Sequence, residues 1–142
     1  MDKQVLDFLK KERVCVLGTV AKDGFPQVSV MHYSLGENPL SFFFSTERTS
    51  HKYKNMLNNN KASCVVGLSE EEWVTVQMDG VIKELAEEEL KEIKNIHYAK
   101  HPDSRQYEHD PNTVFLAFTP NWIRISDYNT SPATIRILKG SY

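Results

Sequence analysis

The chain has 142 residues, of which 40% are hydrophobic and 25% are charged, and its formal net charge is -2. This length suits one compact domain that buries roughly two-thirds of the surface of its unfolded chain, so we expect a single domain over residues 1–142. The small net charge creates no global field that would recruit nucleic acid or an acidic membrane. Any anion must therefore be bound by a local cluster of basic groups.

The cysteines and the apolar segments indicate the cellular compartment of the protein. Cys15 and Cys64 lie inside apolar runs, which predicts buried free thiols in a reducing environment. Residues 1–7 lack the apolar stretch of a secretory signal, and no later segment approaches the ~20 consecutive apolar residues of a membrane span. We therefore expect a soluble, cytoplasmic protein.

The first part of the chain predicts one helix and three strands. Residues 2–12 have apolar residues at helical spacing. The β-rich segments 14–20 and 27–35 flank the turn Lys22-Asp23-Gly24 and should form a hairpin. A third strand, 40–45, is continuously apolar, which predicts burial on both of its faces.

A basic helix follows and ends at Asn58-Asn59-Asn60, and its predicted inward stripe is Tyr53, Met56 and Leu57. Strand structure resumes at 62–68. The segment 73–85 is open to two interpretations, a hairpin that turns at Asp79-Gly80 or one long bent strand with a bulge there.

The last part of the chain predicts a helix over 87–100 that ends at His101-Pro102, and then further strands. Two strands, 113–119 and 122–127, are separated by Pro120-Asn121, and 133–138 forms a last one. Short strands that are joined early by hairpins and interrupted by two or three helices favour an α+β fold, mainly antiparallel, of the barrel kind.

The junction between strand 40–45 and the basic helix has the composition of a phosphate site. The first N–H groups of a helix have no partner within the helix, and hydroxyls of Thr46, Thr49 and Ser50 stand beside them. Lys52 adds a positive charge in the first turn, where the helix dipole repels it unless an anion lies between them. Two other interpretations remain open: a solvated helix face, and a Ser50 that only caps the helix.

Other chemistry is not supported by the motifs. The chain contains no Gly-x-Gly-x-x-Gly, no Gly-x-x-x-x-Gly-Lys and no Gly-x-Ser-x-Gly. His97 and His101 have the i, i+4 spacing of metal ligands, with His109 nearby, but no glutamate or cysteine accompanies them, so we predict no metal site. The acidic run at 87–89 is expected to be charged surface at a helix start.

A set of short segments occurs in a characteristic order: Lys22-Asp23-Gly24, Pro26 to Tyr33, Phe44-Ser45-Thr46, Ser50-x-Lys52-x-x-Asn55 with Asn59, and Trp73 to Gly80. This ordered set, over about residues 2–128, resembles the pyridoxamine 5'-phosphate oxidase-like family of FMN-binding split barrels. The resemblance implies a six-stranded split β-barrel with flanking helices, a homodimer, and one FMN in each of two clefts between the subunits. A small barrel is filled by its own side chains, so a flavin has to lie on an outer face, where a second subunit covers it.

The resemblance also implies positions for the cofactor. The segment with Thr46, Ser50, His51 and Lys52 resembles the one that holds the FMN phosphate, and Arg48 is expected to supplement it. The remaining implied positions are Val30, Met31, His32 and Tyr33 beside the flavin ring, Thr75 and Gln77 on a neighbouring strand, and Trp122 near the partner's cofactor. His32 as a core histidine and Trp122 as a core or interface aromatic remain alternatives.

Two functions follow from this resemblance. The first is an FMN-dependent oxidoreductase that acts on an unidentified small molecule, with NADH or NADPH as candidate electron donor and no assigned catalytic residue except His32 or Tyr33 as candidate proton donors. The second is a non-catalytic module that binds or stores flavin or haem. The Arg-x-His-x-Arg segment of the full pyridoxamine phosphate oxidase has no counterpart after Trp122, so phosphorylated vitamin B6 is not the expected substrate.

Overall fold

The structure is a computed structural model and describes residues 1–140. The helices of this part are α1 (Lys3–Lys11), α2 (His51–Asn58), α3 (Glu87–Lys100) and the 3-10 helix η1 (Pro102–Tyr107). The strands are β1 (Val14–Val20), β2 (Pro26–His32), β3 (Ser34–Gly36), β4 (Ser41–Glu47), β5 (Lys61–Val66), β6 (Val74–Glu84), β7 (Thr113–Asp127) and β8 (Thr134–Lys139).

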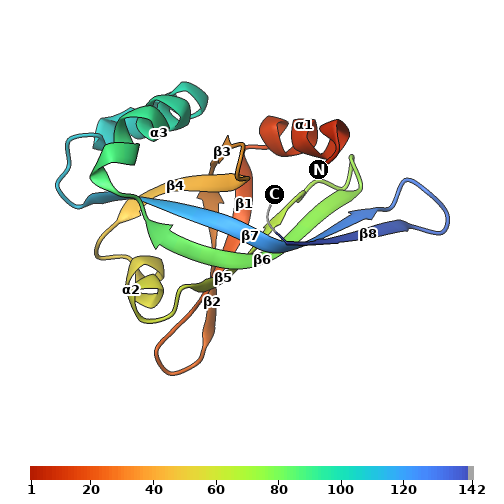
Figure 1. The fold of residues 1–142 in the computed structure, drawn as a ribbon, viewed down its shortest axis with the longest axis horizontal. Coiled ribbons are helices and arrows are strands. Elements are labelled where there is room, and N and C mark those ends of the chain that lie inside the picture. Colours follow the sequence, from red (N-terminus) through yellow and green to blue (C-terminus); the bar gives the residue numbers. More distant parts are fainter. Residues whose placement is uncertain (141–142) are drawn as a thin grey trace.

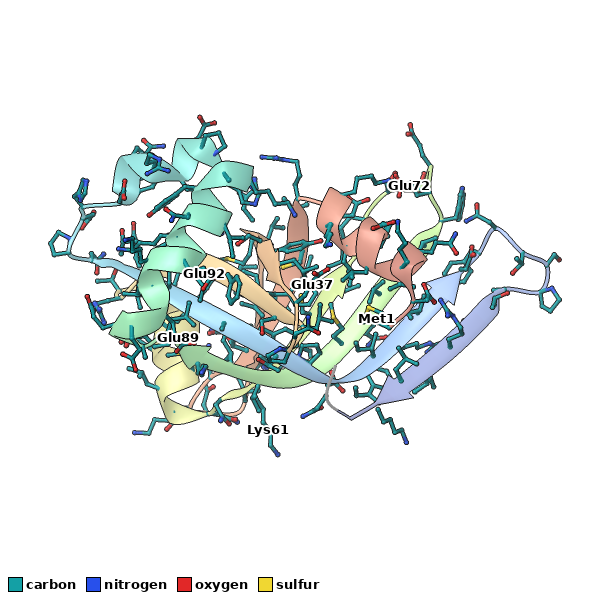
Figure 2. All side chains as sticks on the ribbon, turned by 45° about the horizontal axis from the view of Figure 1, so that its top comes forward. Met1, Glu37, Lys61, Glu72, Glu89 and Glu92 are labelled. Atoms are coloured by element: carbon teal, nitrogen blue, oxygen red, sulfur yellow. The ribbon has the colours of Figure 1, made fainter. Side chains whose placement is uncertain are left out.

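All strands belong to one antiparallel sheet with the order β2-β1-β5-β6-β7-β4-β3, and β8 pairs with the last part of β7. Figure 1 shows the sheet curled, with α1 and α3 above it and α2 below, while the end of β7 and β8 lie at one side of the molecule, next to the start of β6. The architecture is the expected α+β split barrel. The expected number of six strands was too low, because the short β3 and the terminal β8 bring it to eight in the described part.

The core occupies the inside of the curled sheet, and β4 contributes to it on both faces. Phe42 and Phe44 are fully buried in the main apolar cluster, and Phe43 points to the opposite side, into a second cluster beneath α3. This confirms the prediction that strand 40–45 is buried on both faces. Each fully buried aromatic side chain of this kind contributes roughly 1.5–3 kcal/mol to stability.

The predicted strand 27–35 is interrupted at Tyr33. β2 pairs with β1 as far as His32, and Ser34 then pairs with Phe43 of β4. Tyr33 lies at this change of partner, where its N–H donates to the carbonyl oxygen of Arg13 at 3.1 Å. Because one straight strand cannot pair with both neighbours at this corner, the chain forms two strands where the sequence predicts one.

The segment 73–85 forms one long strand, so the bulge interpretation is correct and the hairpin at Asp79-Gly80 is wrong. The register between β6 and β7 shifts there, because Asp79 pairs with Trp122 and Gly80 pairs with Pro120. Asn121 is the extra residue of this bulge. A proline is tolerated in a strand at such a point, and β7 therefore runs through Pro120 and unites the two strands predicted as 113–119 and 122–127.

Helix α2 begins where the sequence predicts, but one of its inward residues differs. Ser50 is the N-cap, and its hydroxyl oxygen accepts a hydrogen bond from the N–H of Tyr53 at 3.3 Å. Met56 is buried as expected, whereas Leu57 is 67% exposed and Asn55 takes the inward position. The Asn55 amide donates hydrogen bonds to polar side chains of the barrel. The sequence-based prediction missed Asn55 because it considered only apolar residues for the inward face.

The two cysteines are buried free thiols, as expected. A hydrogen bond with the Cys15 thiol, together with burial, holds the pKa of Cys64 well above its usual range. In the described part of the chain no helix is long and apolar enough to cross a membrane, and no three acidic, histidine or cysteine side chains are grouped to hold a metal ion.

Candidate functional site

A cavity of about 420 Å³ opens between β2, the end of β4, the start of α2 and the α3–η1 segment. Its volume lies within the range of about 300–1,000 Å³ that is usual for small-molecule sites. Six of the residues expected from the sequence line it: Val30, Met31, His32, Thr46, Ser50 and Lys52. The fold therefore brings the predicted phosphate segment and the predicted ring-side strand to one hollow.

The α2 end of the cavity is rich in hydrogen-bond donors. Thr46 Oγ1 donates to Ser50 Oγ at 3.3 Å, and Ser50 Oγ accepts a second bond from the Tyr53 N–H. Because both of these bonds use Ser50 as acceptor, its own hydroxyl hydrogen stays free to donate. The N–H groups of His51 and Lys52 open the helix and have no carbonyl group one turn earlier to bind.

Lys52 carries an uncompensated charge at this end. In residues 1–140 its ammonium group forms neither an ion pair nor a side-chain hydrogen bond, although it stands in the first turn of α2, next to the positive end of the helix dipole. Glu47 also lines the cavity, but its carboxylate accepts a hydrogen bond from Thr49 Oγ1 at 3.4 Å and does not pair with Lys52. An anion between Lys52 and the free N–H groups would stabilise this corner.

Arg48 does not supplement the corner, contrary to the expectation. Its guanidinium donates to Glu84 Oε1 at 2.9 Å and to the Tyr53 hydroxyl at 3.1 Å. Arg48 is absent from the cavity lining. The sequence does not reveal this because Glu84 lies on β6, far along the chain, and reaches Arg48 only after the barrel forms.

His51 is exposed and lines a neighbouring hollow of about 340 Å³ together with Val28 and Ser29. Lys52 lines both this hollow and the main cavity, so the two are adjacent along β2. Tyr33, by contrast, is fully buried, and its hydroxyl donates to the carbonyl oxygen of Leu9. Burial also raises the pKa of Tyr33, so its side chain is not available to the cavity as a proton donor.

Thr75, Gln77 and Trp122 lie outside the cavity, on the outer face of the sheet. The strand register places Gln77 beside Arg124 of β7, and Trp122 beside Asp79. A row of paired residues runs on this face from β2 across β1, β5, β6 and β7 to β8, and it includes Val30 from the cavity wall: Val30, Val16, Val65, Gln77, Arg124 and Ile137. In a single chain, then, the predicted residues other than Tyr33 and His51 form two groups, a cavity and a sheet face that share Val30.

The cavity also contains residues that the sequence analysis did not assign to a site: His97 of α3, Ser104 and Tyr107 of η1, and Ser45, Glu47 and Thr113 at the strand ends. The segment after His101 contains no periodic pattern, so nothing in the sequence predicts η1 or its position over the cavity. His97 is 1% exposed, yet it also forms part of the cavity wall.

His97 belongs to a cluster of three histidines beside the cavity. Its ring centroid lies 5.1 Å from that of His101, which lies 5.1 Å from that of His32. His97 Nδ1 lies 2.9 Å from Ser34 Oγ. Burial, with His101, His32 and Lys100 close by, lowers the pKa of His97 to about 4 from its usual 6.5, so it is neutral at neutral pH.

A family model described as pyridoxamine 5'-phosphate oxidase matches residues 1–127. No curated protein matches the chain. Among solved structures, a Clostridium acetobutylicum protein related to general stress protein 26, of the pyridoxinephosphate oxidase family, has a TM-score of 0.75 at 17% identity, with 96% of this chain and 92% of that one covered. A pyridoxamine 5'-phosphate oxidase-related, FMN binding protein from Nostoc punctiforme has a TM-score of 0.73 at 13% identity, with 92% and 86% covered.

A haem binding protein from Mycobacterium smegmatis has a TM-score of 0.80 at 15% identity. The alignment covers 94% of this chain but only 55% of that protein, so the chain spans about half of its length. At these identities the structures establish the shared fold alone. Together with the family match over residues 1–127, the fold shows that the chain belongs to the pyridoxamine 5'-phosphate oxidase family.

Proposed function

We propose that this protein binds FMN in the cavity beside α2 and acts as an FMN-dependent oxidoreductase on a small molecule. The observation that supports this most directly is the corner formed by Thr46, Ser50 and Lys52, which supplies hydroxyl and ammonium donors and has an unpaired positive charge. A phosphate monoester provides the charge and the acceptor oxygens that this corner lacks.

The residues present fit the cofactor. Ser50, Lys52 and the first N–H groups of α2 would hold the phosphate, and the β2 residues Val30, Met31 and His32 would lie along the ring. FMN in this position supplies hydride chemistry, whereas the chain supplies binding, orientation and the local charge. His32 is exposed and lines the cavity, which makes it the remaining candidate proton donor of the two that the sequence offered.

We propose that a second copy of the chain completes the site. On the outer face, Val28 and Val30 of the edge strand β2 are 71% and 65% exposed, and Ile137 of β8 is 53% exposed. Arg124 lies on the same face between them, and its Nε atom is buried without a hydrogen-bond partner in the described part of the chain. Apolar side chains and an unsatisfied guanidinium on one face are the features that a partner subunit covers.

The dimer would also bring the outer-face group, Thr75, Gln77 and Trp122, toward a cavity of the other subunit. This accounts for the separation of the predicted site residues into two groups within one chain.

The candidate electron donor is NADH or NADPH. The buried, reduced thiols of Cys15 and Cys64 suit a reducing compartment such as the cytoplasm.

A second candidate function is the binding or storage of haem or flavin without catalysis. It is favoured by the likeness to a haem binding protein and by the two histidines, His32 and His97, in the cavity wall. The absorption spectrum of the freshly purified protein separates the candidates. We expect the bands of oxidised flavin; a Soret band would favour haem, and a flavin that NADH and NADPH fail to bleach under anaerobic conditions would favour storage.

The phosphate corner is tested by titrating apo-protein with FMN and following flavin fluorescence. We expect Lys52→Gln to weaken FMN binding by about 10- to 100-fold, the effect of losing one charge-assisted contact of roughly 1.5–3 kcal/mol. Arg48→Gln is the matched control, because Arg48 is already paired with Glu84. This substitution should change the FMN affinity by no more than about twofold. Equal losses in both variants would contradict the assignment.

A further inference from the structure

We propose that the His97 end of the cavity binds the uncharged carbonyl-type oxygen of a neutral small molecule, such as a ketone, quinone or amide, and discriminates against carboxylates and phosphates. This inference deepens the proposed function and rests on it, because it names the class of substrate for the same cavity. The argument depends on the position of one proton, that on the imidazole ring of His97.

Ser34 fixes the position of that proton. Ser34 is 1% exposed, and its hydroxyl has only one hydrogen-bond partner among the described residues, His97 Nδ1 at 2.9 Å. A buried hydroxyl donates wherever an acceptor is available, so the Ser34 hydroxyl donates to Nδ1. The ring hydrogen of His97 is then on Nε2, which has no partner in the described structure, while the residue forms part of the cavity wall.

His101, the next ring of the cluster, is held neutral by two partners of opposite kind. Its Nε2 lies 2.6 Å from the carbonyl oxygen of Tyr33, which can only accept, and its Nδ1 lies 3.2 Å from Nη2 of Arg13, which can only donate. A proton on Nδ1 would face the guanidinium. His101 therefore cannot take up a proton on behalf of His97.

The surroundings of His97 oppose a positive charge on its ring. Lys100 is close by, and its ammonium lies 4.3 Å from the centroid of the Tyr33 ring, while Arg13 donates to the carbonyl oxygen of Lys100. No carboxylate forms an ion pair with His32, His97 or His101 in residues 1–140. If His97 became charged, Ser34 would also have to become an acceptor, and its buried hydroxyl hydrogen would lose its partner.

These contacts leave the Nε2–H of His97 as a neutral donor in the cavity wall. A carbonyl oxygen accepts such a bond without any change in protonation. A carboxylate or phosphate would gain most from a charged imidazole, which the Ser34 contact and the neighbouring cations disfavour. Lys52, which has no ion-pair partner among residues 1–140, lies at the α2 end of the cavity, to which the cofactor phosphate is assigned.

The test compares two probes of nearly equal shape, acetophenone and benzoate, with FMN-saturated protein by calorimetry or ligand-observed NMR near neutral pH. We expect acetophenone to bind at least about tenfold more tightly than benzoate. His97→Phe should weaken acetophenone binding by about five- to tenfold, the effect of one lost hydrogen bond, whereas His109→Phe, at a side chain that is 94% exposed, should not. Benzoate binding equal to or tighter than acetophenone binding would overturn the inference, as would an unchanged acetophenone affinity in His97→Phe.

A second measurement does not require FMN. The ¹⁵N shifts of the His97 imidazole should show the neutral ring with its hydrogen on Nε2 from about pH 5.5 to pH 8, and Ser34→Ala should remove this preference. A hydrogen on Nδ1, or a ring that is protonated near pH 6.5, would overturn the inference even if His97→Phe fails to fold. Failure to bind FMN would instead refute the proposed function, and the imidazole shifts would still be measured in the apo-protein.

Discussion

Asn55 of α2 donates a hydrogen bond from its side-chain amide to Thr19 Oγ1 of β1 at 3.1 Å, and both residues are buried. The same amide nitrogen donates to Gln27 Oε1 at 2.8 Å, so one side chain connects the helix to two strands. Because Ser50 and Lys52 stand at the start of this helix, the connection fixes the proposed phosphate corner against the barrel.

Asn55→Ala should therefore destabilise the protein and weaken FMN binding together. Two hydrogen bonds are lost, and a buried acceptor is left without its donor, so we expect a decrease of about 2–3 kcal/mol in the free energy of unfolding, measured with urea. Asn58→Ala is the control, since Asn58 is exposed at the end of the same helix. Because alanine is the better helix former, Asn58→Ala should not lower the stability, and similar losses in the two variants would contradict the role assigned to the buried contact of Asn55.

Gly80 permits the bulge between β6 and β7. A Cβ atom at this position would lie 2.2 Å from the carbonyl oxygen of Thr119 and 2.8 Å from Cα of Pro120, both of them backbone atoms that cannot move aside. We expect Gly80→Ala to lower the free energy of unfolding by about 2–3 kcal/mol. At Gly18 the nearest atom would be 3.5 Å away, so Gly18→Ala should cost less than about 1 kcal/mol in the same urea experiment.

The stability of the protein should fall in mild acid because of His97. Its pKa is about 4 in the folded protein and about 6.5 in the unfolded chain, so between these values the unfolded chain binds a proton that the folded protein excludes. The contribution of His97 to the free energy of unfolding is complete above about pH 6.5 and is lost as the pH falls toward 4. The loss is on the order of 2–4 kcal/mol.

This contribution is checked by urea unfolding at about pH 7 and about pH 4.5. The free energy of unfolding should decrease less between these two pH values in His97→Gln than in the unmodified protein. The difference should be most of the roughly 2–4 kcal/mol, because the variant has no imidazole to protonate at this position. Carboxylates titrate over the same range in both proteins, and the comparison removes their effect. Parallel pH profiles of the two proteins would show that His97 does not have the expected low pKa.

Charge on the outer face should dissociate the proposed dimer. Val30→Asp places a carboxylate among the exposed apolar residues of that face, so we expect monomers in analytical ultracentrifugation and a loss of FMN binding. Leu57→Asp is the control, because Leu57 is equally exposed on α2 but does not belong to the sheet face. A Val30→Asp protein that remains dimeric would locate the interface elsewhere.

Most of the elements are predictable from the sequence because each depends on neighbours in the chain. The helix over residues 87–100 follows from its apolar spacing, and the start of α2 follows from the capping chemistry of Ser50. The predicted strand boundaries were wrong at two places: where the chain leaves β1 to pair with β4, and where β7 continues past a proline along β6. β2 ends at His32 because Ser34 already pairs with β4, and β7 passes Pro120 because its extra residue, Asn121, forms a bulge against β6.

By itself, the sequence determined that Thr46, Ser50 and Lys52 form one corner, because they are at most six positions apart and local backbone geometry brings them together. The tertiary structure alone decided that Arg48 is engaged by Glu84 and that Ser34, 63 residues before His97, orients its imidazole. The physical reason is the range of the interactions: caps and turns form between neighbours in the chain, whereas these contacts exist only once the sheet has closed around its core.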